Sequence, residues 1–161
     1  MSCDVALAAY LFLASTSPSS APPQVTPAVA TSTAGGVASE PLFVDIVTRA
    51  GRLKSLVDSY RSARGLKAAP HPASLPGFAR FQAQIGELSA LDMKGHVELA
   101  ARGTDGDLKC ILKGISMDLS AKLQLLAQAS TGAAQDQALR DMSYLLNDNV
   151  EVITAPPAPA V

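Results

Sequence analysis

The sequence predicts an all-α fold, an antiparallel bundle of about four helices over residues 41–155, and two observations lead to this prediction. Large apolar residues recur at three- and four-residue steps in four successive stretches, a spacing that places them on one face of a helix. The stretches are separated by short segments rich in Gly or Pro, and short connections favour antiparallel neighbours.

The first predicted helix begins near Pro41 and ends near Gly65. Pro suits a first helical turn because the N–H that it lacks would have no partner there, and Gly is a common C-terminal stop. A loop follows, in which His71 lies between two prolines. The apolar face of this helix consists of Phe43, Ile46, Ala50, Leu53, Val57 and Tyr60.

The second predicted helix carries an apolar face of Phe78, Phe81, Ile85 and Leu88 and extends to Ala101. Ser89 and Asp92 have the spacing of a capping box, which predicts a break or kink there. A turn is predicted at Gly103-Thr-Asp-Gly106.

The last two predicted helices are separated by Gly132. Their apolar faces are Leu108, Leu112, Ile115, Leu119, Leu123 and Leu126, and then Leu139, Met142, Leu146, Val150 and Ile153. An α+β alternative has a hairpin at about residues 96–113, because apolar and polar residues alternate on both sides of Asp105-Gly106. The near-3.6 period from Leu108 to Leu126 favours the helix.

Residues 1–40 form an Ala/Ser/Pro-rich segment with only two charges, Asp4 and Glu40. With so few large apolar groups, this segment is predicted to be disordered, and the short tail of residues 156–161 has the same character. Residues 1–16 contain an apolar run of signal-peptide length, but a basic start is absent. We therefore expect a cytoplasmic protein, with export as the alternative, and no transmembrane span.

Motifs that would identify an enzyme are absent from the sequence. It has no phosphate-binding loop, dinucleotide fingerprint or nucleophile elbow, and its two histidines, His71 and His96, form no pattern with its two cysteines. Cys110 is expected to act as a small buried apolar residue, and His96 as a structural histidine. We predict no catalytic residue, metal ligand or cofactor, and an enzyme remains an alternative only with a site that the sequence does not identify.

Basic residues concentrate in the first helix. Residues 45–67 carry six Lys or Arg against two Asp, a net charge of +4, whereas residues 77–155 carry seven basic and ten acidic side chains, a net charge of −3. The basic helix can dock on its own acidic bundle, or Arg49 and Arg52 can contact an acidic protein. Nucleic acid is not expected, because no aromatic residues accompany the arginines.

The segment Cys110-Ile-Leu-Lys-Gly-Ile-Ser-Met-Asp-Leu-Ser-Ala121 resembles the signature of histidine phosphotransfer domains, which are four-helix bundles. The match covers Leu112, Lys113 and Gly114, with small residues at Ser116 and Ala121. The family has its phospho-accepting His where this chain has Cys110. The resemblance implies a degenerate bacterial signalling module that binds a receiver or a kinase without transferring phosphate.

These observations predict a non-catalytic, regulatory helical protein that binds another protein, and the abundant Ala, Gly, Pro and Arg suggest a bacterial source. Self-association is also expected if the small helices leave apolar surface uncovered. The candidate partner-contact residues are Cys110, Lys113, Gly114, Arg49 and Arg52.

Overall fold

The computed structural model describes residues 34–63, 75–103 and 106–155, and these ranges are helical apart from short turns. The helices are α1 (Ala34–Ala38), α2 (Pro41–Ala63), α3 (Phe78–Arg102), α4 (Gly106–Gln128) and α5 (Gly132–Thr154). None of the three ranges contains a strand. The all-α prediction is confirmed and the hairpin alternative is wrong, because both of its proposed strands belong to α3 and α4.

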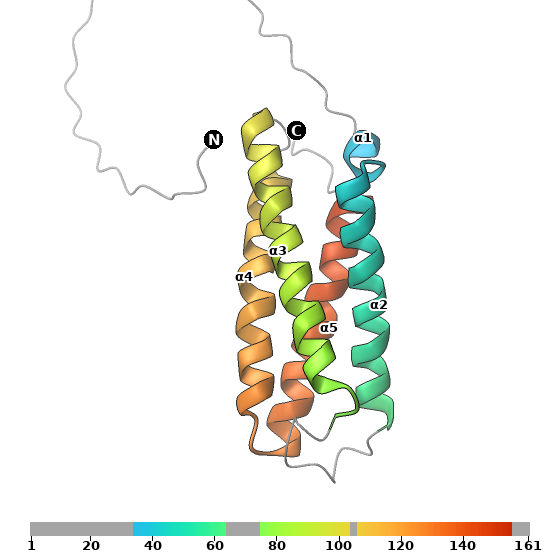
Figure 1. Ribbon diagram of the computed structural model, residues 1–161, viewed down its shortest axis with the longest axis vertical. Coiled ribbons are helices and arrows are strands. Elements are labelled where there is room, and N and C mark those ends of the chain that lie inside the picture. The colour runs from blue at the N-terminus through green and yellow to red at the C-terminus, as the bar shows by residue number, and fades with distance from the viewer. Residues whose placement is uncertain (1–33, 64–74, 104–105, 156–161) are drawn as a thin grey trace, which may run out of the picture. The chain divides into compact units, whose positions relative to one another are not determined.

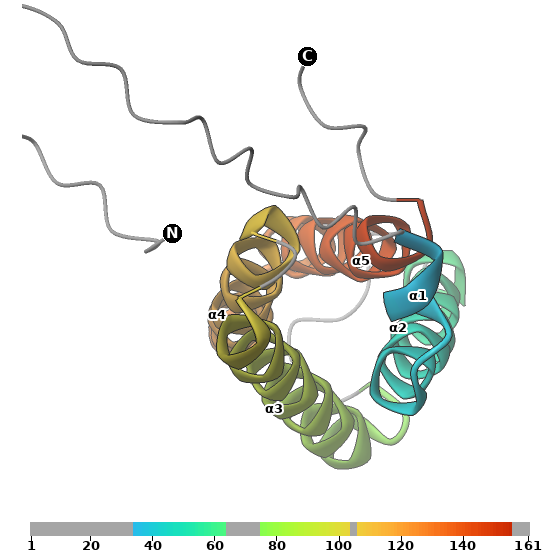
Figure 2. The same ribbon diagram turned by 90° about the horizontal axis from the view of Figure 1, so that it is seen from above.

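Helices α2 to α5 form an antiparallel four-helix bundle (Figure 1). Viewed from above, they follow one another around the bundle in chain order, and α5 closes the ring against α2 (Figure 2). Helix α1 contacts both α2 and α5 at one end of the ring. Helices α2 and α4 therefore lie diagonally opposite each other.

Helix α1 lies before residue 41, where the sequence predicts the folded domain to start. Val37 is buried in the core, and the Arg102 guanidinium donates to both carboxylate oxygens of Glu40, at 2.7 and 2.8 Å. One buried Val and this bidentate ion pair hold residues that composition alone assigned to the disordered segment. The disorder predicted for residues 1–33 and 156–161 falls outside the described residues.

The core consists of the apolar faces that the sequence identified. All six apolar positions predicted for the first helix are buried, and Phe81, Ile85 and Leu88 of α3 are inaccessible to solvent. Four predicted core residues are only half-buried: Phe78, Leu108, Leu123 and Val150. All four still pack against the buried core.

Helix α3 is continuous from Phe78 to Arg102, so the break predicted at Ser89 and Asp92 is wrong. Both side chains are buried and bond to other helices instead of capping a helix start. The hydroxyl of Ser89 donates to the carbonyl of Ser116 on α4, and the hydroxyl of Ser116 donates to the carbonyl of Ser89, each at 2.8 Å. This reciprocal pair fixes the register of α3 against α4.

A second buried polar pair joins α3 to α5. Asn149 Nδ2 donates to both carboxylate oxygens of Asp92, at 3.0 and 2.9 Å, and neither residue is exposed to solvent. The Asn149 Oδ1 atom has no hydrogen-bond partner in the structure. Burial raises the pKa of Asp92 to about 7, although the hydrogen bond from Asn149 acts in the opposite direction.

Gly95 lies where α3 approaches both α2 and α4. A Cβ atom at this position would lie 3.1 Å from Leu112 Cδ1 and 3.3 Å from Phe43 Cε1, whereas a Cβ at Gly86, on the same helix, would meet no atom within 4 Å. The absence of a side chain at Gly95 therefore allows the three helices to pack closely.

Replacing these two glycines by Ala is expected to change stability in opposite directions. Gly95→Ala should lower the free energy of unfolding by about 1–2 kcal/mol, because the crowding exceeds the gain in helix propensity. Gly86→Ala should raise it by about 0.5–1 kcal/mol through propensity alone. Urea denaturation of both variants tests the pair. If Gly95→Ala were stabilising, the side chains of Leu112 and Phe43 would move aside without loss of packing energy, which would contradict this prediction.

Candidate functional site

A groove of about 310 Å³ lies between α2 and α3. Helix α2 supplies most of its wall, with side chains spaced three or four residues apart and so on one side of the helix. The groove is lined by Asp45, Arg49, Arg52, Leu53 and Leu56 of α2 and by Gln84 of α3. The two arginines that the sequence identified as candidate contacts thus share one site.

Arg49 is held in place by carboxylates from both helices. Its Nε donates to Asp45 Oδ1 one turn earlier on α2, and its Nη1 donates to Glu87 Oε2 on α3, both at 2.9 Å. The hydrogen bond to Asp45 is the main cause that raises the pKa of Arg49 above its ordinary value. Arg49 therefore links the two walls of the groove and is oriented before any ligand arrives.

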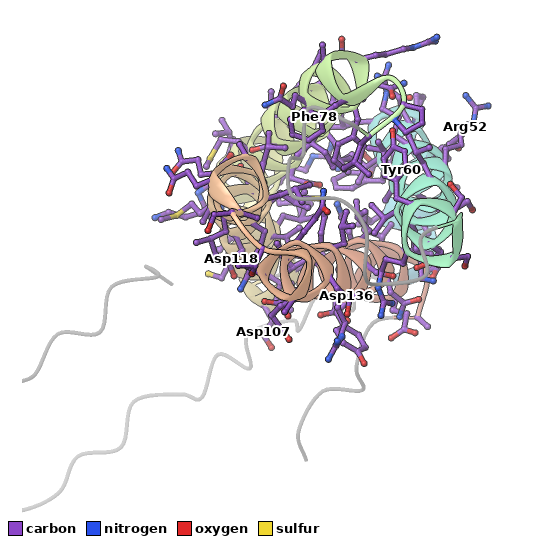
Figure 3. All side chains as sticks on the ribbon, turned by 90° about the horizontal axis from the view of Figure 1, so that it is seen from below. Arg52, Tyr60, Phe78, Asp107, Asp118 and Asp136 are labelled. Atoms are coloured by element: carbon purple, nitrogen blue, oxygen red, sulfur yellow. The ribbon has the colours of Figure 1, made fainter. Side chains whose placement is uncertain are left out.

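Arg52 differs from Arg49 because it is exposed and forms no ion pair with any residue that the structure describes. Its side chain points away from the bundle beside α2 (Figure 3). A guanidinium has five N–H donors in a planar fork that suits carboxylates. The N–H donors of Arg52 are therefore available at the groove to bind a carboxylate of a ligand.

Other basic residues of α2 are engaged within the bundle. Lys54 donates to Asp58 at 2.8 Å, and Arg61 donates to Asp136 of α5 at 3.0 Å. Burial opposes ionisation of Asp136, but hydrogen bonds from Arg140 and Arg61 lower its pKa overall. Arg61 therefore links α2 to α5, whereas Lys54 is paired within α2 itself.

The other candidate contact residues lie on α4 and do not join the groove. Cys110 and Lys113 are half-buried and Gly114 is exposed, with no atom within 4 Å of a Cβ built on it. Cys110 is disulfide-bonded and not the free, buried cysteine that the sequence led us to expect. Because α4 lies diagonally across the ring from α2, the structure separates these residues from Arg49 and Arg52 (Figure 2).

The remaining polar candidates have structural partners. The Nδ1–H of His96 donates to the backbone carbonyl of Lys109 at 2.7 Å, while His71 falls outside the described residues. Lys122 pairs with Asp141 of α5 at 2.8 Å instead of with the nearby Asp118 on its own helix. Within the described ranges, no group of three His, Cys, Asp or Glu side chains could hold a metal ion.

Asp45, Leu53, Leu56 and Gln84 line the groove, although the sequence did not mark them as candidate contacts. Leu56 is a half-buried leucine beside the main apolar face of α2, four residues after Arg52, and that spacing was the available signal. Gln84 had no signal in the sequence, because its role depends on which part of α3 lies opposite Arg52.

In the described part of the chain, no helix is both long and apolar enough to cross a membrane. Comparisons with protein-family models, curated proteins and solved structures found no match to this chain. Its function must therefore be inferred from the geometry of its own residues.

Proposed function

We propose that the chain is a non-catalytic helical module that binds another protein through the α2–α3 groove. The observation that supports this proposal is the exposed Arg52 beside an apolar wall of Leu53 and Leu56. Arginine beside well-packed apolar side chains is typical of residues that contribute most to protein–protein binding.

The groove combines fixed and adaptable elements. Leu53 is 4% exposed and is held in the core, and Arg49 is fixed by its two carboxylates, so these groups need little ordering when a partner binds. Arg52 is the adaptable element, because its exposed side chain can reorient toward a partner.

Site-specific photo-crosslinking in the source cells tests this proposal. A photo-reactive residue at position 84, inside the groove, should give a defined adduct with one protein. The same residue at Ala90, an exposed position on α3 that does not line the groove, is the matched control. The captured protein should then bind the purified chain, with affinity about tenfold lower for Arg52→Glu.

Equal adducts at positions 84 and 90, or unchanged affinity in Arg52→Glu, would contradict binding at the groove. Circular dichroism of each variant checks that the helices are retained. Because Arg52 forms no ion pair with the described residues, its replacement should leave the fold intact.

A degenerate phosphotransfer-like module is the second candidate, and the exposed, uncrowded Gly114 favours it. The resemblance to that family implies that a receiver domain would approach α4 at this glycine, next to Lys113 and Cys110. In this case Gly114→Trp should abolish partner binding, whereas Arg52→Glu should have no effect. The two variants therefore distinguish the two candidate surfaces.

A further inference from the structure

We infer that the segment entering the α2–α3 groove is acidic, with an Asp or Glu carboxylate next to an apolar side chain. This inference rests on the proposed function and adds the chemistry of the partner. Three features of the groove lead to it: its charge, its apolar wall and its size.

The charge is uneven along the groove. At one end, Arg49 is balanced by Asp45 and Glu87. Toward the other end, Arg52 is exposed and has no ion pair within the described ranges. A carboxylate bound at this end would meet uncompensated positive charge, whereas a cationic side chain would be repelled.

The register of the two helices supports this placement. Arg49 lies beside Glu87, and farther along α2 the Tyr60 ring contacts the Phe81 ring edge-on at 5.6 Å. Because α2 and α3 run antiparallel, Arg52 is opposite Gln84, between these two contacts. A carboxylate at Arg52 therefore has the Gln84 amide as a second donor across the groove.

The apolar wall and the volume define the rest of the bound segment. Leu56 is half-buried and presents part of its side chain to the groove, above the buried Leu53. A volume of about 310 Å³ lies at the small end of the range of protein ligand pockets, about 300–1,000 Å³. It therefore admits one or two side chains of a partner while the partner's backbone remains outside.

Selection of a random-peptide library against the full-length chain tests this inference. The selected peptides should be enriched in Asp or Glu next to Leu, Ile or Phe. A synthetic copy of the best peptide should bind Arg52→Glu about tenfold more weakly than the unaltered chain. Lys94→Glu is the control, because Lys94 is an exposed cation on α3 that does not line the groove and whose ion pair, with Glu98 on the same helix, is long at 3.8 Å.

A charge-swapped peptide, with its acidic residue replaced by Lys, should recover binding to Arg52→Glu and lose binding to the unaltered chain. Enrichment of neutral or basic peptides that still depend on Arg52 would overturn the acidic chemistry and leave the groove as a binding site. Peptides indifferent to Arg52→Glu, or no enrichment, would overturn the inference, while crosslinking at position 84 decides the proposed function separately.

Discussion

The bundle should lose stability as the pH rises from about 4 to about 7, and Asp92 is the expected cause. In the folded chain Asp92 keeps its proton up to a pKa of about 7, whereas the ordinary pKa of an Asp side chain is 3.8. Between these values the folded state binds more protons than the unfolded state, so the free energy of unfolding falls with rising pH and levels off above about 7.

The effect is large because the pKa shift is large. The difference between about 7 and 3.8, at about 1.4 kcal/mol per pH unit, corresponds to a loss of up to about 4 kcal/mol. Urea denaturation at a series of pH values measures it. Asp92→Asn should flatten this part of the pH profile, since an amide has a similar shape to the protonated acid and does not titrate.

Asp148→Asn is the control, because it removes an exposed carboxylate from the same bundle, one residue before Asn149. This variant should keep the slope of the unaltered chain. Equal slopes in Asp92→Asn and the unaltered chain would show that Asp92 ionises in the folded state without cost.

At low pH the bundle should lose stability because carboxylates in ion pairs become protonated. Hydrogen bonds from Lys54 and Lys122 are the main causes that lower the pKa values of Asp58 and Asp141, respectively. The stability that they contribute is present above the unfolded pKa and is lost as the pH falls through the folded value. Together with Asp92, they place the stability maximum at mildly acidic pH.

Phe81→Ala is expected to give the largest loss of stability for a single core substitution, about 3–5 kcal/mol. Phe81 is fully buried, and its ring contacts those of Tyr60 on α2 and Phe78 on α3, at centroid distances of 5.6 and 6.3 Å. Truncation would leave a cavity beside the Tyr60 ring. The hydroxyl of Tyr60 donates to the carbonyl of Pro76, just before α3, at 2.6 Å, so the cavity would weaken the packing where the end of α2 meets the start of α3.

Phe78→Ala makes the same chemical change three residues earlier, where the side chain is only half-buried. It should cost less than half as much, because less apolar surface is returned to water. Thermal or urea denaturation compares the two variants. Equal losses would show that the ring stack, and not burial of Phe81, determines the stability of this end of the bundle.

The candidate site shows how far prediction from sequence reached. The clustering of basic residues in one helix identified Arg49 and Arg52, and both line the groove. The same pattern did not distinguish Arg49, which links two helices, from Arg52, which has no ion pair among the described residues. That difference depends on Glu87 of α3, which is 38 positions away in sequence.

The sequence by itself determined the four long helices and the apolar face of each, because helix formation and amphipathic spacing depend on residues within a few turns. It missed the short α1, whose burial depends on contacts with α2 and α5. It misassigned Ser89 and Asp92 as a capping signal, since their partners, Ser116 and Asn149, belong to other helices. Only the tertiary structure decided these polar pairs and brought Gln84 opposite Arg52. The physical reason is that such contacts depend on the register between packed helices, which no local pattern encodes.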